Sequence, residues 1–439
     1  MNYYQRFFLC VSIPFLLLLS FFPCSFSQTV HAASSLTESA DFELRGVWVS
    51  YFEFFQLGLS NKSKSVFTQN ANRMFQTAKA HGFNAVFLHV RSHDDAIYPS
   101  TVTGWSKYIS YQGRGLSYDP LKILVRLAHK NDMEFHAWMN PYRITETSTL
   151  NPASSSTINR IVSQVKEIIS NYDVDGIHFD DYFYPSNELR YRSVPIETRK
   201  RYVNKMIRKV YKTIKKKSKS IRFGVSPAGD LSYCNSIGAD VWTWLSAKGY
   251  VDYIAPQIYW SDHYILHGQS IPLYSNRIRE WTSLNKLHLP MYIGLAGYKA
   301  GETLSEDPGW RESSWNLYAQ LGLAKKAGAA GYLFFKYSDL LRGNAKNEVI
   351  NMMYQISTMT LSKTRMTLSV GKKQKLFVTA LSPAALQTKI IWKSKQPEIA
   401  SVSKKGVVTA NSAGKTKIYA YCRNLRRTCV VKVRKSIST

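Results

Sequence analysis

Short apolar segments alternate with longer segments of helical periodicity from about residue 40 to residue 358. Each short segment is almost continuously apolar, which is typical of strands buried on both faces of a parallel sheet. The eight predicted strands are Leu44–Ser50, Ala85–Arg91, Met133–Asn140, Val174–Asp180, Ile221–Pro227, Val251–Tyr259, Pro290–Ala296 and Gly331–Lys336. The eight predicted helices are Val66–His81, Pro120–Lys130, Ile158–Tyr172, Glu197–Lys217, Ala239–Lys248, Tyr274–Leu284, Trp315–Lys326 and Asn347–Thr358.

This alternation predicts an α/β fold, a closed (β/α)8 TIM barrel, over residues 41–356. An open, doubly wound sheet is the alternative. It is disfavoured because no GxGxxG sequence follows the first predicted strand.

The pattern changes near Leu361, where short runs of alternating polar and apolar residues are separated by glycine-containing turns. The predicted strands are Met366–Val370, Gln374–Ala380, Ile390–Ser394, Ile399–Val402, Val407–Ala410, Gly414–Cys422 and Thr428–Val433. This spacing predicts a small all-β sandwich over residues 361–434, joined to the barrel by a linker at Ile356–Ser362.

The N-terminus has the pattern of an export signal. Arg6 precedes an apolar run, and Val30-His31-Ala32 supplies small residues at the positions expected before a cleavage site. We predict that residues 1–33 are a secretory signal peptide, with an uncleaved anchor as the alternative. No later apolar stretch is long enough to cross a membrane, so the mature chain is expected to be secreted or wall-associated, without a transmembrane helix.

The cysteines and the charge distribution refine this expectation. An oxidising location would permit a cross-strand disulfide between Cys422 and Cys429, whereas Cys234 is interpreted as a packing residue.

The net charge is +29, and residues 361–439 carry 18 of the 58 Lys and Arg residues with Glu398 as their single acid. This excess predicts an anionic partner for the C-terminal domain, such as teichoic acids, peptidoglycan carboxylates or lipid headgroups. Nucleic acid is not expected, because the chain has no motif that reads it and is predicted to be exported.

The most informative chemistry lies where the fourth predicted strand ends. Two adjacent acids, Asp180 and Asp181, close that strand, and aromatic residues follow them. Carboxylates at the carboxyl ends of barrel strands are the groups that glycoside hydrolysis requires, although an acidic turn after a buried strand is the structural alternative. Asp180 is the first catalytic candidate, as nucleophile, base or orienter of a substrate acetamido group. Asp181 is the second, because adjacent acids can divide the two roles when burial raises one pKa.

Other strand ends supply candidate substrate-binding residues with amide, phenol, guanidinium, imidazole or indole groups. They are Arg91, Asp95, Asn140, Tyr142, Arg143, His178, Tyr182, Gln257, Tyr259 and Trp260. Salt bridges within the protein are the alternative role for Arg91 and Asp95, and a satisfied interior position is the alternative for His178.

The identity of Gln257 restricts the chemistry. An amide cannot donate a catalytic proton, so the second acid must be one of Asp181, Asp95, Asp230, Asp262 and Glu53, or the substrate must replace it. We expect no cofactor and no catalytic metal.

Several of these segments carry a family resemblance. Residues 43–340 resemble the bacterial glycosyl-hydrolase-like family ten through Glu43–Val49, Val90–Ser100, His136–Arg143, Asp173–Pro185 and Val251–Trp260. The resemblance implies a barrel, a glycosidase-type site and action on peptidoglycan glycans. A fainter similarity links Asp175–Tyr182 to the strand-four signature of family eighteen chitinases, but Tyr182 occupies the position of the chitinase acid.

The second domain has a resemblance of its own. Three segments, Trp392–Ser403, Gly406–Ala410 and Ala413–Thr416, are similar to a group-two bacterial Ig-like domain, which implies an adhesion module. Together these features predict an exported glycoside hydrolase that cleaves an N-acetylated cell-wall glycan, peptidoglycan strands above all, by carboxylate or substrate-assisted catalysis. A wall-glycan-binding protein that retains a glycosidase-like cleft without turnover is the alternative.

Overall fold

The structure is a computed structural model that describes residues 43–145, 147–184, 191–355, 359–381, 390–422 and 425–435. Eight parallel strands form its first domain, in the order β11-β12-β1-β2-β5-β6-β7-β8. Parallel bridges from Ile254 to Met291 and from Gln257 to Gly294 join the two ends of this sheet and close it into a barrel. The strands are β1 (Leu44–Val49), β2 (Ala85–Arg91), β5 (Glu134–Met139), β6 (Gly176–Phe179), β7 (Arg222–Val225), β8 (Tyr253–Ile254), β11 (Tyr292–Ala296) and β12 (Gly331–Phe335).

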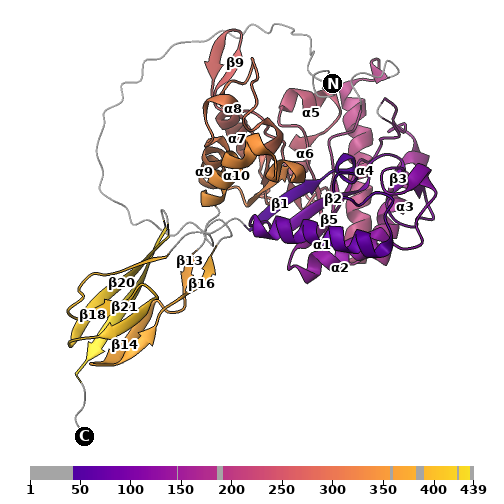
Figure 1. Cartoon of the computed structure of the whole chain (residues 1–439). Helices are drawn as coiled ribbons and strands as arrows, with labels where there is room; N and C mark the ends of the chain where they lie inside the picture. The colour runs from indigo at the N-terminus through magenta and orange to yellow at the C-terminus, as the bar shows by residue number, and fades with distance from the viewer. Residues whose placement is uncertain are drawn as a thin grey trace. The chain divides into compact units, whose positions relative to one another are not determined.

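A helix follows each barrel strand, and the helices lie around the outside of the sheet (Figure 1). They are α1 (Lys64–Ala80), α2 (Pro120–Lys130), α3 (Ser155–Asn171), α4 (Ile196–Lys217), α6 (Val241–Ser246), α7 (Leu273–Leu284), α9 (Asn316–Lys326) and α10 (Lys346–Gln355). The predicted TIM barrel is therefore confirmed, and the open sheet is excluded. The last three residues of the final predicted helix, 356–358, lie outside the described residues.

Short additional elements decorate the loops of the barrel. They are β3 (Asp95–Ala96), β4 (Gly104–Trp105), α5 (Leu231–Ser236), the hairpin of β9 (Tyr264–Leu266) and β10 (Gln269–Ile271), and α8 (Gly309–Glu312), together with the 3-10 turns η1 (Tyr51–Glu53), η2 (Tyr111–Gly113), η4 (Gly297–Lys299), η5 (Tyr337–Leu340) and η6 (Gly343–Ala345).

Side-chain alternation along β6 separates the two apolar cores of the barrel. Gly176 and His178 point into the barrel, while Ile177 and Phe179 face the surrounding helices. The interior core consists of large rings and aliphatic side chains from several strands, namely Leu44, Trp48, Ala85, Phe87, Trp138, Tyr253, Ala255, Tyr292 and Leu333. These rings fill the barrel and support the residues at its carboxyl end.

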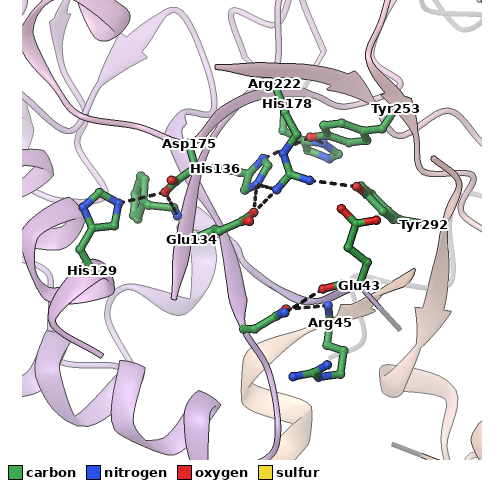
Figure 2. Close-up of polar contacts among 12 residues, drawn as sticks. Glu43, Arg45, His129, Glu134, His136, Asp175, His178, Arg222, Tyr253 and Tyr292 are labelled. Carbon is green, nitrogen blue, oxygen red and sulfur yellow. Dashed lines mark hydrogen bonds and ion pairs between the residues drawn. The ribbon is translucent and has the colours of Figure 1, made fainter. Parts of the chain in front are cut away.

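Polar side chains occupy the barrel interior nearer its amino-terminal end, as Figure 2 shows. Arg222 pairs with Glu134 and donates a hydrogen bond to the hydroxyl of Tyr292 at 3.0 Å. His136 lies against the same carboxylate, with its Nε2 3.0 Å from Glu134 Oε2. Burial lowers the pKa of His136 and keeps its ring neutral. The charged groups of this layer are paired with one another, so the layer has a structural role beneath the active site.

The C-terminal domain is all β. A four-stranded sheet in the order β14-β21-β20-β17 and a three-stranded sheet in the order β15-β19-β18 share one apolar core, which includes Met366, Val408, Ile418 and Val431. The strands are β14 (Arg365–Ser369), β15 (Lys373–Lys375), β17 (Ile391–Ser394), β18 (Ala400–Val402), β19 (Val407–Ala410), β20 (Gly414–Cys422) and β21 (Leu425–Arg434). The predicted sandwich is confirmed.

The predicted linker requires a correction. Residues 359–361 form β13 (Met359–Leu361), which pairs antiparallel with β16 (Val378–Leu381). Most of the second half of the predicted linker is therefore a strand, which the three residues Met-Thr-Leu did not reveal. Residues 356–358 lie outside the described part of the chain.

The sequence left open a disulfide between Cys422 and Cys429, and the register of β20 and β21 excludes it because it separates the two cysteines. Cys422 lies opposite Leu425, and Cys429 lies opposite Ile418. Four residues along a strand span about 13 Å, which is beyond the Cα separation that a disulfide bridges. Cys429 is accordingly a free, buried thiol. Cys234 is also free and buried, with its Sγ 3.1 Å from the carbonyl oxygen of Ala228, which confirms its role in packing.

The predicted signal peptide lies outside the described residues. Among the residues that the structure describes, no helix is both long and apolar enough to span a bilayer.

The first prediction concerns the packing of the barrel interior. A Cβ atom on Gly224 would lie 2.1 Å from the Tyr253 ring, so Gly224→Ala must displace a buried aromatic side chain. We expect the free energy of barrel unfolding, followed by tryptophan fluorescence in urea, to fall by about 1–3 kcal/mol. Gly343→Ala is the matched control, because nothing lies within 4 Å of the position that its Cβ would take. Equal stability of the two variants would show that the interior is not tightly packed at Gly224.

Candidate active site

Asp180 follows β6 directly and continues its inward-facing series. Its Oδ1 accepts two hydrogen bonds, from the backbone N–H of Asp181 at 2.9 Å and from Nε2 of Gln257 at 2.9 Å. Only 7% of the residue is exposed, so it lies at the carboxyl end of the barrel with little contact with water. The strand alternation predicted this inward direction, but it also placed Asp180 at an open mouth, whereas the residue is buried. Burial raises its pKa, whereas the two N–H donors and the charge of Arg143 oppose that rise.

Asp181 lies beside it and is more exposed. The two carboxyl groups are within hydrogen-bonding reach of each other. Burial, followed by the neighbouring charge of Asp180, raises the pKa of Asp181 well above its ordinary range. The pair therefore ionises in two steps, and its first negative charge belongs on Asp180, because Asp180 accepts the two N–H hydrogen bonds. Of the two carboxyl groups, Asp181 is the one whose surroundings favour the protonated form more strongly.

Gln257 holds this arrangement in place. Its Nε2 donates both to Asp180 and to the carbonyl oxygen of Ser226, each at 2.9 Å, so the amide bridges β6 and the end of β7. A Cβ on Gly229 would lie 2.4 Å from the carbonyl oxygen of Gln257, which explains the glycine at that position. Gln257 was predicted to bind substrate, but the structure shows that its amide orients the Asp180 carboxylate.

A cation between two rings lies next to the acid pair. The guanidinium of Arg143 is 4.6 Å from the ring centre of Tyr182 and 5.8 Å from that of Tyr51. Tyr182 exposes 41% of its surface, whereas Arg143 is largely buried. Burial and the charges of Asp180 and Asp181 raise the pKa of Tyr182, so its hydroxyl stays protonated. The structure therefore brings Arg143 and Tyr182 together with the acids.

Tyr259 and Trp260 extend the aromatic surroundings from the segment after β8. Tyr259 stacks on Phe335 at a centroid distance of 6.1 Å, and its backbone carbonyl accepts a hydrogen bond from Lys299 at 2.7 Å. Burial raises its pKa well above the ordinary value, and both Asp180 and Asp181 contribute to that rise. The Trp260 ring lies 5.8 Å from the guanidinium of Arg277. Both of these predicted binding residues are half-buried.

Two of the predicted binding residues are instead part of the buried framework. Arg91 is 1% exposed, and its guanidinium donates to the carbonyl oxygen of Asn140 and to Asp94 at 3.0 Å. Asn140 is fully buried, with its amide between His89 and the carbonyl oxygen of Ser92. Their side chains link β2 to β5 and cannot reach a saccharide.

Tyr142 and His178 are corrected for the same reason. The Tyr142 ring packs edge-on to Phe183 in the core and has no exposed surface. His178 Nδ1 lies 3.0 Å from the Tyr253 hydroxyl, and its Nε2 lies 3.1 Å from the Ser226 hydroxyl. Burial lowers the pKa of His178 well below its ordinary value, so it is a neutral, satisfied interior histidine (Figure 2).

The other candidate acids form local structural bonds. Asp95 accepts the backbone N–H of His93 at 3.0 Å, Asp230 caps α5 through the N–H of Tyr233 at 2.8 Å, and Asp262 accepts the N–H of Ser275 at 2.7 Å. Asp95 was predicted to bind substrate, but its hydrogen bond with His93 stabilises a turn instead. Asp181 is thus the acid that remains beside Asp180.

Glu53 is the last of these acids, and it is almost completely buried. Its carboxylate accepts the backbone N–H groups of Ser50 and Ser338, each at 2.7 Å, and so joins the loops after β1 and β12. Burial raises its pKa to about 7. Glu53 therefore has a structural role, because its contacts hold the loops after β1 and β12 together.

Two contributors were missed in the sequence. Tyr51 lies just after β1 and forms one side of the Arg143 site, and the backbone of Ser226 helps to hold Gln257. The rule that functional residues follow strand ends would have selected Tyr51, because it comes two residues after β1. A backbone carbonyl such as that of Ser226 leaves no signal in a sequence. Within the described ranges, no group of three or more His, Cys, Asp or Glu side chains is placed to hold a metal ion.

Comparison with known proteins agrees with this geometry. The family model of glycosyl hydrolase-like 10 matches residues 43–160 and 142–312, and that of the group 2 bacterial Ig-like domain matches residues 355–424. A solved structure, the endo-1,4-beta-mannanase from Rhizomucor miehei, shares the fold with a TM-score of 0.50 at 10% identity, covering 73% of this chain and 96% of that one.

Two relatives have been named as hydrolases. Glycosyl hydrolase YngK of Bacillus subtilis (strain 168) is 29% identical over 371 aligned residues, which cover 69% of each chain. Glycosyl hydrolase DigH of Escherichia coli (strain K12) is 32% identical over 298 aligned residues, which cover 52% of this chain and 65% of the relative. The family match extends over more than half of the chain, including the acid pair and the strands that carry it. The chain is therefore a glycosidase that belongs to the glycosyl hydrolase-like 10 family.

Proposed function

We propose that this glycosidase cleaves the N-acetylated glycan strands of the cell wall, peptidoglycan above all, with the acetamido group of the substrate as the nucleophile. The observation that carries the proposal is the adjacent pair of Asp180 and Asp181, in which Asp180 accepts two N–H hydrogen bonds and burial beside it raises the pKa of Asp181.

The closeness of the two carboxyl groups supports this mechanism over the alternatives. Double displacement needs carboxyl groups about 5–5.5 Å apart on opposite sides of the sugar, and inversion needs about 6.5–9.5 Å. Asp180 and Asp181 are within hydrogen-bonding reach of each other, so both act from one side. A nucleophile from the substrate itself removes the need for a carboxylate on the opposite side.

The reaction then divides between the two acids. Asp181 donates its proton to the glycosidic oxygen as the bond from that oxygen to C1 breaks, and the acetamido oxygen forms a bond to C1. The Asp180 carboxylate accepts the acetamido N–H and stabilises the positive charge that develops on the ring formed. Asp181, now ionised, takes a proton from the water that attacks C1, which regenerates the acetamido group and the acid.

The neighbouring side chains suit a glycan that carries carboxylates. Exposed aromatic faces such as that of Tyr182 stack on the apolar faces of pyranose rings, and Tyr259 and Trp260 extend this surface. Arg143 supplies a cation beside the acid pair, which favours a substrate with a lactyl carboxylate. These features favour an N-acetylmuramic acid unit in the bound strand.

We further propose that the protein is exported and that its basic C-terminal domain retains it on anionic wall polymers. The basis is the N-terminal signal pattern together with the excess of Lys and Arg after residue 360. Exposed lysines such as Lys372, Lys373, Lys404 and Lys405 lie on this domain.

The second prediction separates the two acids. Asp181→Asn removes the proton donor, and we expect its release of reducing ends from glycan strands to fall by about 10²–10⁴-fold. An N-acetylglucosaminide with a dinitrophenyl leaving group needs no proton, so the initial burst of phenol should be much less affected. Asp180→Asn should impair both substrates, because the acetamido group loses its partner.

The control for both variants is Asp173→Asn, an almost fully exposed aspartate before β6. It should leave both rates unchanged. Full activity of Asp181→Asn on glycan strands would reject Asp181 as the acid.

The third prediction concerns Gln257. Gln257→Glu replaces an N–H donor to Asp180 with a like charge, which raises the pKa of Asp180. Asp180 must be ionised to act, so the acidic limb of the kcat profile should move to higher pH. A lower rate with an unmoved acidic limb would mean that Gln257 acts only through packing.

The fourth prediction concerns retention. The full chain should bind isolated Gram-positive walls at low salt and elute as the salt concentration rises, because screening weakens contacts between exposed charges. A variant with Lys372→Gln, Lys373→Gln, Lys404→Gln and Lys405→Gln should elute at lower salt. Identical elution of the two proteins would exclude these lysines from binding.

A further inference from the structure

The barrel carries its own concentration of positive charge on helix α4. This helix has ten Lys and Arg residues and one acid, Glu197, among its 22 residues. Five of its exposed cations are spaced four, three, four and four residues apart, and we refer to them as the cationic row: Arg201, Lys205, Arg208, Lys212 and Lys216.

Helix geometry places these five side chains in one line. At about 100° per residue they fall within an arc of roughly 80°, and at 1.5 Å per residue they extend over about 22 Å. The opposite face of α4 is apolar and buried through residues such as Val203, Ile207 and Val210, so the barrel fixes the helix. The cationic row is thus a rigid linear array.

The acids near α4 are already engaged. Glu197 pairs with Lys200 at 2.9 Å, Asp252 pairs with Lys215 at 2.6 Å, and Asp240 accepts a hydrogen bond from Asn204 at 2.7 Å. None of the described acids forms an ion pair with a member of the cationic row. Its charge is therefore available to a partner outside the chain.

A groove adjoins the first half of the cationic row. It has a volume of about 500 Å³ and is lined by Arg201, Lys205 and Arg208 together with Lys200, Asn204, Asp240, Glu197 and Tyr250. The guanidinium of Arg208 lies 5.8 Å from the ring centre of Tyr250, which holds this side chain at the edge of the groove. The groove gives room for an anionic group larger than a single ion.

We propose that the cationic row and its groove bind a linear phosphodiester polymer of the polyol-phosphate type, separately from the C-terminal domain. A line of cations about 22 Å long matches a chain with regularly repeated negative charges. This site requires neither the proposed glycan substrate nor the proposed mechanism.

The shape and composition of the row disfavour two other polyanionic partners. A helix that lies on a membrane inserts an apolar face between lipids, but the apolar face of α4 is buried in the barrel, and Ile196 is its one exposed large aliphatic residue among those described. Single-stranded nucleic acid needs exposed rings for base stacking, and Tyr202, Tyr211 and Tyr250 beside the row are partly buried.

The position of α4 gives the site a consequence. A helix that follows a parallel strand begins at the carboxyl end of that strand and runs back along it. The cationic row therefore starts at the end of the barrel that carries Asp180 and Asp181 and leads away from it. A polymer bound along the row would hold the catalytic end of the barrel against the material to which the polymer is attached.

The fifth prediction tests the row in the full chain with labelled inorganic polyphosphate as the probe, by fluorescence anisotropy over a series of salt concentrations. The row variant carries Arg201→Gln, Lys205→Gln, Arg208→Gln and Lys212→Gln, and glutamine preserves helix propensity. We expect its affinity to fall by at least about tenfold and its log–log salt dependence to become shallower by roughly 2–4. The pair Lys212→Gln and Lys216→Gln alone should give an intermediate loss, which keeps the test valid if the fourfold variant folds poorly.

The matched control removes four exposed cations from α1 and α2 by Lys64→Gln, Lys122→Gln, Arg126→Gln and Lys130→Gln. Its affinity should stay within about twofold of the unmodified chain. Hydrolysis of a short chitooligosaccharide should be equal in all variants, which separates this site from the active site. An equal loss in the control and the row variant would overturn the proposal.

Two further arms test the class of partner. Row-dependent binding to phosphatidylglycerol vesicles but not to polyphosphate would overturn the proposal in favour of a lipid surface. Tighter row-dependent binding to single-stranded DNA than to polyphosphate of equal charge would overturn it in favour of nucleic acid.

Discussion

The adjacent carboxyl groups of Asp180 and Asp181 ionise differently because the side-chain amide of Gln257 donates a hydrogen bond to Asp180. Gln257 donates to Asp180, and the backbone N–H of Asp181 donates to the same oxygen, so the first negative charge of the pair is stabilised there. Burial, and after it that charge, raises the pKa of Asp181. Without this asymmetry the two acids would compete for one proton, and neither would have a defined role. The rest of the barrel can be understood as support for this difference.

The support is arranged in layers below the acids. His178 lies one layer deeper and is held neutral between Tyr253 and Ser226, and beneath it Arg222 pairs with Glu134. Arg91 and Asn140 join β2 to β5 through buried polar contacts. Each of these side chains is buried or makes polar contacts within the protein. The residues proposed for catalysis therefore lie just beyond the strand ends, where Asp181 and Tyr182 are close to Arg143.

The fold could be predicted from the sequence because each strand is short, apolar and followed by a helical segment. The site could be predicted only in part. Alternation along β6 predicted the inward direction of Asp180, but position at a strand end did not reveal which way a side chain turns. Arg91, Asn140 and Tyr142 turn inward, where burial and backbone contacts hold them. In the sequence, Gln257 indicated only that an expected acid is missing at its position. Its role depends on its hydrogen bond to Asp180, which the sequence does not reveal. The sequence left the pairing of Cys422 and Cys429 open for the same reason, because the register of β20 and β21 cannot be deduced from cysteine spacing.

The unequal ionisation of the acid pair is open to direct observation. A carbon-13 NMR titration of the aspartate carboxyl groups, recorded for the unmodified chain and for Asp181→Asn, isolates the signal of Asp181 in the difference. The account predicts a carboxyl group that titrates well above the ordinary aspartate value of about 3.9 and is missing from the variant. A titration of both Asp180 and Asp181 near that ordinary value would contradict it.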